Sequence, residues 1–258
     1  MREKPFAEIH SIPAWELDGT PCPLEDSSEV KALRKAGFYE ELMELAYELS
    51  WQLRYRDAIK IYNWAVLLRP SEHEAVRLRG ARYLSTLQPE KALPDLRKAI
   101  ELGADEGDTG YSIGLCHYFM GDYAAAIEEF ERIYPLFTAE MGIATMFWHT
   151  AAAIRSGKES VLLPLYREDM DVGHHTSYRF SVRLLSGLMT VEEALPLIEN
   201  EEDDLEHAMM AYGALLWYER NGEYERAREM RDKILRRDDF WIGYAFLAAW
   251  NDRRREEE

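Results

Sequence analysis

A short pattern of residues returns every 34 positions along this chain of 258 residues. Ala58, Ala92 and Ala126 are each separated by 34 residues, and each closes an apolar pattern that starts about twelve residues earlier. A fixed period of this length is typical of stacked helical hairpins, in which each hairpin buries its apolar face only against its neighbours. The period therefore predicts an all-α array, and such arrays hold partners more often than they carry out chemistry.

The overall composition limits the partners. Hydrophobic residues make up 47% of the chain and charged residues 31%, which excludes a wholly disordered polymer. The chain has 31 Lys and Arg residues against 48 Asp and Glu residues, for a net charge of −17. Because so acidic a surface repels phosphate backbones and anionic lipids, we expect neither a nucleic acid nor a membrane as partner.

The cysteines and the N-terminal sequence indicate a compartment. Cys22 and Cys116 are too few and too dissimilar in context to form a disulfide framework. The polar start of the chain has no apolar signal core, and no stretch approaches the ~20 apolar residues of a membrane span. We therefore expect a reduced, cytoplasmic protein.

Motifs for chemistry are missing from the sequence. It contains no nucleophile elbow, phosphate loop or dinucleotide fingerprint. The adjacent His174 and His175 would point about 100° apart on a helix, which makes a shared metal ion difficult. His117 fits a buried helix position better than a ligand site. The sequence thus predicts a protein that is not an enzyme and needs no cofactor or metal.

Residues 1–38 are predicted to form an arm and a short helix. The arm contains four prolines that block helix formation: Pro5, Pro13, Pro21 and Pro23. Ser27 or Ser28 would cap the short helix, and Gly37 would end it. The apolar side chains of the arm (Ile9, Ile12, Trp15 and Leu17) suggest that it covers the first hairpin. The alternative is that the arm fills a groove of this chain or of a neighbouring subunit.

From residue 39 the sequence resembles the tetratricopeptide repeat (TPR) family. The three clearest repeats are 39–72, 73–106 and 107–142, and the last contains the stretch GLCHYFMGDYAAAIEEFERI. The first repeat has Leu42, Leu45, Ala46, Tyr55, Ala58, Tyr62, Ala65 and Pro70 at family positions, the second has Val76, Gly80, Tyr83, Ala92, Leu96 and Ala99, and the third has Gly114, Gly121, Tyr123, Ala126, Phe130 and Ile133.

The spacing within a repeat has a physical cause. Positions 4, 7, 8 and 11 lie on one face of the first helix of the hairpin, helix A, and positions 20, 24 and 27 lie on one face of the second, helix B. Small residues at positions 8 and 20 let the two backbones approach closely. The resemblance implies an all-α, right-handed α-solenoid of about six TPR-like hairpins.

The later repeats are more divergent. Repeat 143–174 has Gly157 and Tyr166 at family positions but Leu162 where an alanine is usual, and repeats 175–207 and 208–241 follow. Three repeats have proline at position 22: Pro94, Pro164 and Pro196. These prolines are either tolerated on an outer helix or bend the stack. Thr190 and Glu193 predict a capping box before Pro196.

The array is predicted to occupy 39–241 and a C-terminal capping helix 242–258. The apolar pattern of this last helix begins earlier, so we expect helical residues over 239–256, capped by Asp238 or Asp239. A polar run, Asn251 to Glu258, ends the chain. A polar terminal helix suits an open stack, which needs a soluble end.

The resemblance also implies a binding surface, the concave wall lined by positions 2, 5, 9, 12 and 13 of each helix A. The candidates for a partner-binding groove on this wall are Tyr47, Trp51, Arg77, Tyr111, Tyr118, Phe119, Phe147, Arg155, Arg179, Arg183 and Tyr212. Aromatic rings and arginines of this kind dominate binding hot spots, and guanidinium groups hold carboxylates. The Lys and Asn pattern by which some family members clamp an acidic chaperone tail is absent.

The sequence leaves three functions open. We expect a non-catalytic adaptor that binds a protein or peptide bearing acidic groups. The alternatives are a self-assembling structural protein, active as a homo-oligomer, and a small-ligand sensor or enzyme with a site at the divergent fourth repeat, around Phe147, Arg155 and Tyr166.

Overall fold

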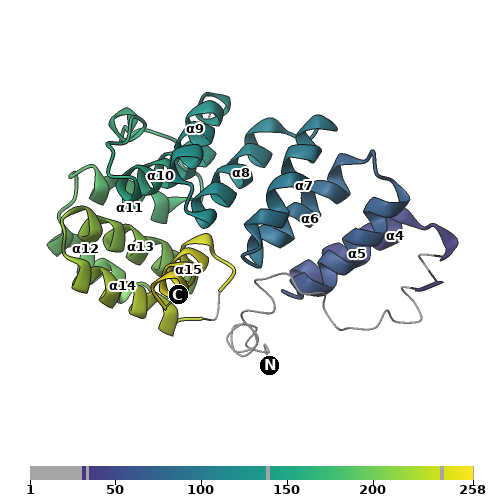
Figure 1. The fold of residues 1–258 in the computed structure, drawn as a ribbon. Helices are drawn as coiled ribbons and strands as arrows, with labels where there is room; N and C mark the ends of the chain where they lie inside the picture. The colour runs from purple at the N-terminus through teal and green to yellow at the C-terminus, as the bar shows by residue number, and fades with distance from the viewer. Residues whose placement is uncertain (1–30, 33–34, 138–139, 239–240, 258) are drawn as a thin grey trace. The chain divides into compact units, whose positions relative to one another are not determined.

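The computed structural model of this chain describes residues 31–32, 35–137, 140–238 and 241–257. Every regular element in this part of the chain is helical, as the sequence predicts (Figure 1). The predicted Pro-rich arm lies outside the described residues, so its role stays a prediction. The described residues fall into two compact units, one up to Cys116 and one from His117 onward.

The first unit consists of helical hairpins. Its helices are α4 (Tyr39–Trp51), α5 (Tyr55–Leu68), α6 (His73–Ser85), α7 (Pro89–Glu101) and the first part of α8 (Glu106–Met120). α4 pairs with α5, α6 pairs with α7, and α5 packs on α6 to join the two hairpins (Figure 1). The 34-residue period of the sequence thus becomes a succession of helix pairs.

Small residues set the distance between paired helices. Ala46 on α4 and Ala58 on α5 have no exposed surface. A Cβ atom at Gly80 would lie only 3.0 Å from Cγ of Leu96 on α7. Few real Cβ atoms lie so close to a neighbour, so glycine lets α6 and α7 pack at this distance without displacing the Leu96 side chain.

The turns between paired helices need a left-handed backbone at repeat position 15. Gly121 and Gly222 supply it with φ of 79° and 76°. Leu53 and Leu87 stand at the same position with φ of 60° and 53°, a conformation that costs an L-residue about 1–2 kcal/mol. Leu87 is only 3% exposed, so burial of its side chain offsets this cost.

The second unit begins with the end of α8. Its further elements are α9 (Tyr123–Ile133), η1 (Tyr134–Leu136), α10 (Glu140–Arg155), η2 (Leu163–Leu165), α11 (Thr176–Leu185), α12 (Val191–Asn200), α13 (Asp204–Arg220), α14 (Tyr224–Arg236) and α15 (Tyr244–Glu257). α9 packs on α10, α11 and α12 both pack on α13, and α13 pairs with α14.

Two helices of this unit are enclosed on every side. All residues of α10 from Gly142 to Ala153 are buried, as are those of α13 from His207 to Leu216. Their sequences are apolar around the whole helix, which is the pattern of a central helix rather than of an amphipathic surface helix.

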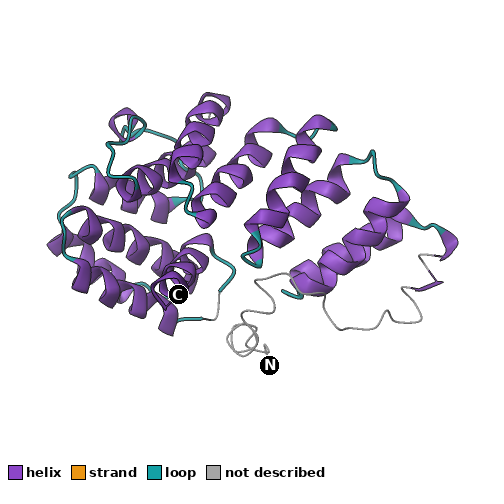
Figure 2. Cartoon of the chain, in the orientation of Figure 1, coloured by secondary structure: helices purple, strands orange, loops and turns teal. Residues whose placement is uncertain are grey.

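The second helix of the fourth repeat, predicted within 143–174, is not formed. Residues 156–175 instead form a loop between α10 and α11 that contains only the short 3₁₀ turn η2 (Figure 2). Pro164 stands in the first turn of η2 and Leu162 replaces the small residue that close helix pairing needs. Ser160 anchors this loop, because its Oγ accepts from the Leu163 amide at 3.1 Å and lies 2.8 Å from Nδ1 of His149.

The C-terminal helix also starts later than predicted. α15 begins at Tyr244, and residues 241–243 form a turn that ends in Gly243. Glycine is a poor helix former, which explains why the helix does not extend back to 239. Asp238 therefore does not cap α15, and Asp239 lies outside the described residues. α15 packs on α13 and α14.

Interior prolines are accommodated on exposed faces. Pro94 lies within α7 and Pro196 within α12, and both side chains are exposed. The capping box of Thr190 and Glu193 is confirmed, with Thr190 Oγ1 accepting from the Glu193 amide and Glu193 accepting from the Thr190 amide. Among the described helices, none combines the length and the apolar character that crossing a bilayer requires.

Replacing Gly213 by alanine is expected to destabilise the second unit. A Cβ atom there would lie 2.6 Å from Cβ and 3.1 Å from Cα of Ser181 on α11. Such overpacking costs about 1–3 kcal/mol. Gly142→Ala is the matched control, because its Cβ would meet nothing closer than 3.9 Å and alanine favours a helix by up to about 1 kcal/mol. Urea unfolding of both variants measures the difference, and equal stabilities would contradict close contact between α11 and α13.

Pro94→Ala is expected to leave folding intact and the melting temperature equal or higher. The substitution restores an amide donor inside α7, where an unrelieved proline costs about 3 kcal/mol, and removes a ring that contacts mainly solvent. Thermal unfolding followed by circular dichroism measures the change. A clear drop in melting temperature would show that the proline bend is needed by the fold.

Candidate functional site

The predicted wall residues of the first unit include two exposed aromatic rings. On α4, Tyr47 is 53% exposed and Trp51 is 73% exposed, and their ring centroids lie 6.0 Å apart in an edge-to-face arrangement. Arg77 on α6 is half-buried and forms no hydrogen bond or ion pair with another described residue. Tyr111 on α8 is buried. The accessible candidates of this unit are therefore Tyr47, Trp51 and Arg77.

The aromatic candidates of the second unit belong to its core. Tyr118, Phe119, Phe147 and Tyr212 are at most 2% exposed. They surround Trp148 of α10, whose ring lies 5.1 Å from that of Tyr118, 5.2 Å from that of Phe147 and 5.9 Å from that of Tyr212. These rings are therefore not accessible to a partner.

Trp148 is not one of the predicted wall residues. It stands next to a predicted wall position rather than on one, so the family pattern gave no reason to choose it. The apolar character of α10 around its whole circumference was the available signal, since such a helix must be enclosed.

Arg155, at the end of α10, is the centre of an ion-pair network. It donates to both carboxylate oxygens of Asp252 on α15, at 2.7 and 2.8 Å, and its Nε lies 2.8 Å from a carboxylate oxygen of Glu219 on α13. Tyr212 also donates to Asp252 at 3.1 Å. The sequence predicted that Arg155 would hold an acidic group, and in this structure the acidic groups near it come from its own chain.

Burial changes the ionisation of this network. Desolvation raises the pKa of the Glu219 carboxyl, although the charge of Arg155 opposes the shift. Desolvation also raises the pKa of Tyr118 and Tyr212, whose hydroxyl oxygens are 2.7 Å apart. For Arg155, desolvation acts to lower the pKa, but Asp252, Tyr118 and Tyr212 together more than offset it and the pKa is raised. The guanidinium therefore stays charged and fixed in place.

α15 also contacts the end of α8, through the carbonyl oxygen of Phe119. Asn251 Nδ2 donates to the carbonyl oxygen of Phe119 at 3.0 Å, and Arg255 Nη2 donates to the same oxygen at 2.6 Å. That carbonyl lies in the last turn of α8, where helix geometry leaves carbonyl groups without an intrahelical partner. α15 thus caps α8. It covers Phe119 and Tyr118, which stand at wall positions 13 and 12 of the third repeat.

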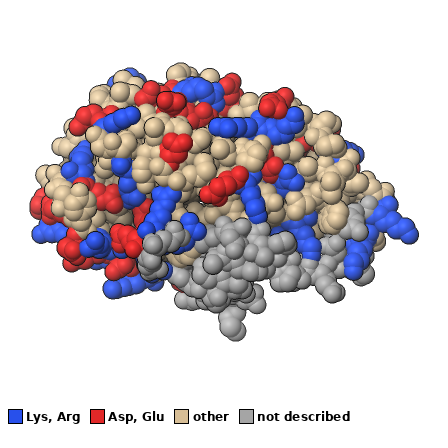
Figure 3. Space-filling model, viewed as in Figure 1, with Lys and Arg blue, Asp and Glu red and all other residues tan. Residues whose placement is uncertain are grey.

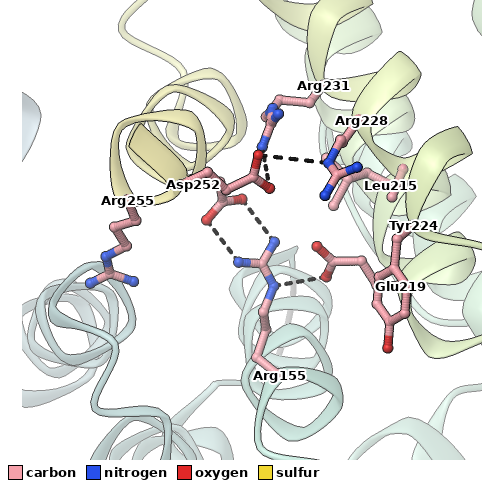
Figure 4. Close-up of a pocket in the computed structure, with 10 residues that line it drawn as sticks. Arg155, Leu215, Glu219, Tyr224, Arg228, Arg231, Asp252 and Arg255 are labelled. Carbon is pink, nitrogen blue, oxygen red and sulfur yellow. Dashed lines mark hydrogen bonds and ion pairs between the residues drawn. The ribbon is translucent and has the colours of Figure 1, made fainter. Parts of the chain in front are cut away.

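A cavity of about 260 Å³ opens beside this network (Figure 4). It is lined by Arg155, Leu215, Glu219, Tyr224, Ala227, Arg228, Arg231, Asp252, Arg255 and Glu256. Four of these residues are arginines and three are acidic, although the chain as a whole is strongly acidic. The cavity was not predicted, because its lining comes from α10, α13, α14 and α15, which only the tertiary structure brings together.

Two further candidates, Arg179 and Arg183 on α11, hold the loop that replaces the missing helix. Arg179 donates to the carbonyl oxygen of Met170 at 2.5 Å, and Arg183 pairs with Glu168 at 3.0 Å. Both side chains are partly exposed. They contact the loop rather than Arg155, so the structure does not bring the predicted arginines of the second unit into one cluster.

A serine of the 156–175 loop, a histidine of α10 and a glutamate of α9 lie in contact with one another. Nδ1 of His149 lies 2.8 Å from Ser160 Oγ, and its Nε2 lies 3.1 Å from Glu131. Ser160 Oγ also accepts from the Leu163 amide at 3.1 Å and lies 3.0 Å from Thr150 Oγ1, whose single hydroxyl hydrogen also faces the Met146 carbonyl oxygen at 2.7 Å. These contacts hold Ser160 in place within the loop. Desolvation lowers the pKa of His149, which fits a neutral structural histidine that anchors the loop.

The surface charges are mixed. On the face shown in Figure 3, acidic and basic side chains alternate and no continuous basic field is visible. Within the part of the chain that the structure describes, no three His, Cys, Asp or Glu side chains come together in a way that could hold a metal ion.

Comparisons with known proteins give the following likenesses. No protein-family model matches the chain. DnaJ homolog subfamily C member 3 of Gallus gallus is 26% identical over 113 residues, which cover 44% of this chain and 22% of that relative. The match therefore spans about a fifth of the relative's length.

Two solved structures are also similar. YrrB, described as a TPR protein with an unusual peptide-binding site, has a TM-score of 0.46 and 19% identity, covering 88% of this chain and 98% of YrrB. The TPR domain of P58(IPK) has a TM-score of 0.38 and 16% identity, covering 91% of this chain and 72% of that domain.

Asp252→Asn is expected to destabilise the protein by about 3 kcal/mol, because it leaves the buried Arg155 guanidinium with one carboxylate instead of two. Asp232→Asn makes the same charge change on an exposed part of α14 and is expected to change stability by less than about 0.5 kcal/mol. Denaturant unfolding of the two variants measures the contrast. Equal stability of both variants would show that the network contributes nothing to the fold.

Proposed function

We propose that this chain, an array of tetratricopeptide-type helical hairpins, is a non-catalytic adaptor that binds a protein or peptide. The single observation that carries the proposal is the exposed aromatic pair on α4, Tyr47 and Trp51. Exposing a tryptophan and a tyrosine side by side keeps a large apolar area in water, and exposed apolar groups that adjoin one another mark interaction sites.

The face of the first unit formed by helices α4 and α6 is the proposed binding surface. Tyr47 and Trp51 supply flat apolar area, and Arg77 supplies a half-buried guanidinium group. Tryptophan, tyrosine and arginine are the residue types most enriched in binding hot spots. A guanidinium group on this face favours a ligand with an acidic group, in agreement with the expectation from the sequence.

The corresponding face of the second unit supports binding less well. Its aromatic wall residues are buried around Trp148, and α15 covers the Phe119 carbonyl and supplies Asp252 to Arg155. α15 itself buries Phe246, Leu247 and Trp250. Releasing these side chains would each cost about 1.5–3 kcal/mol, so a partner that displaced the whole helix would lose most of its binding energy. We therefore assign the main contact to the first unit.

Trp51→Ala is expected to weaken partner binding by about 30-fold or more, since truncation of a hot-spot residue costs about 2 kcal/mol or more. Leu67→Ala is the control, because Leu67 is 69% exposed on α5, the second helix of the same hairpin. The full-length protein is immobilised, proteins retained from a native cell extract are identified, and the affinity of the purified partner is then measured by calorimetry for both variants.

Comparison of Trp51→Ala with the Leu67→Ala control decides whether the partner uses the α4 face. A partner that binds Trp51→Ala and Leu67→Ala equally well does not use the α4 face, and the adaptor would then work through another surface. Circular dichroism of each variant establishes that the substitution has not unfolded the hairpin.

A further inference from the structure

Two arginines of α14 converge on one acidic side chain at the end of the chain. Arg231 Nη1 lies 2.7 Å from Glu256 Oε1, and Arg228 Nε lies 3.8 Å from Glu256 Oε2. Arg228 also donates through Nη1 to Glu225 of its own helix at 2.8 Å. Residues three apart on a helix lie on one face, so α14 presents two guanidinium groups to the cavity. Two guanidinium groups on one side of a cavity are a strong carboxylate-binding arrangement.

Arg231 is held in place before any ligand arrives. Its side chain is only 9% exposed, and its buried Nε has no hydrogen-bond partner in the part of the chain that the structure describes. A buried donor without an acceptor costs about 1–3 kcal/mol or more when the group is charged. An incoming carboxylate that binds side-on, through Nε and Nη2, would satisfy the Nε donor, which Glu256 at Nη1 does not do.

The rest of the cavity restricts what can enter. Arg155 is already paired with two carboxylates, those of Asp252 and Glu219, and is not available to a ligand. Leu215 and Ala227 add apolar surface, and Tyr224, which is 62% exposed, lies at the rim. A volume of about 260 Å³ is below the roughly 300–1,000 Å³ of pockets for whole small-molecule ligands. The cavity thus suits an acidic side chain with an apolar neighbour, and a free phosphate would leave the apolar lining unused.

Solvent reaches Glu256, whose side chain is 50% exposed, whereas the buried residues of α15 end at Asn251. Arg255 of the same turn donates to the Phe119 carbonyl oxygen, so the helix itself stays in position. Glu256 can therefore leave Arg231 by rotating its side chain into water.

We propose that Arg228 and Arg231 form a carboxylate-binding site whose resident occupant is Glu256, and that an acidic side chain of a bound peptide enters by displacing Glu256. The proposal rests on the proposed function and adds to it a second contact point, in the second unit. The chain's own last turn would then compete with the partner, so the apparent affinity would depend on how often Glu256 leaves the site.

The experiment titrates the full-length protein with the peptide acetyl-Leu-Glu-Leu-amide and follows the arginine Nε–Hε signals by NMR. Glu256→Gln removes the competing carboxylate and is expected to bind the peptide about tenfold more tightly than the wild type, as for a site otherwise occupied about nine-tenths of the time. Glu229→Gln is the matched control, because it makes the same charge change at an exposed position of α14 and is expected to leave the affinity unchanged. Arg231→Met is expected to abolish binding and to remove one arginine signal.

Each outcome decides the proposal. Tighter binding by Glu256→Gln alone supports it, whereas equal affinities of Glu256→Gln and Glu229→Gln, or no binding by any variant, overturn it. Parallel titrations use acetyl-Leu-Gln-Leu-amide, acetate and inorganic phosphate. If the glutamine peptide binds as well, or if acetate or phosphate binds as tightly as the glutamate peptide, the site is not one for an acidic peptide side chain. A protein partner that still depends on Trp51 would leave the proposed function intact even if this site fails.

Discussion

The structure depends on close approach of helix backbones at positions where side chains are small. No hairpin of this array can bury its apolar face alone, so stability comes from contact between successive helices. A small residue stands at each of these close contacts: Ala46 and Ala58 in the first hairpin, Gly80 against Leu96 in the second, and Gly213 against Ser181 in the second unit. A larger side chain at these positions would separate the helices and open gaps in the surrounding core.

The second unit departs from the regular pattern because one helix is missing. The loop 156–175 replaces the second helix of the fourth repeat, and the enclosed helix α10 is covered by α9, α11 and α13 instead. The end of α10 then lies within reach of α13 and α15, so Arg155 contacts Glu219 and Asp252 although they stand 64 and 97 positions further along the chain. Loss of regularity in one repeat thus creates the buried charged network and the cavity beside it.

The two units consequently offer different surfaces to a partner. In the first unit the face of α4 exposes two aromatic rings, whereas in the second unit the equivalent rings are packed around Trp148. The C-terminal helix contributes Asp252, which pairs with the buried Arg155, and the half-exposed Glu256, which pairs with Arg231. The contacts of Ser160 with His149 and with the Leu163 amide fix the loop that replaces the missing helix.

The sequence by itself determined the helical hairpins, because the 34-residue period, the small residues at positions 8 and 20 and the capping box at Thr190 act through local spacing. It also placed the exposed rings of Tyr47 and Trp51 on one helix face. The tertiary structure alone decided that Tyr118, Phe147 and Tyr212 are buried, that residues 156–175 form a loop, and that Arg155, Arg228 and Arg231 surround one cavity. Repeat spacing fixes which way a side chain points from its own helix. Which element covers it depends on long-range packing, and that packing changed when Pro164 and Leu162 prevented one helix from forming.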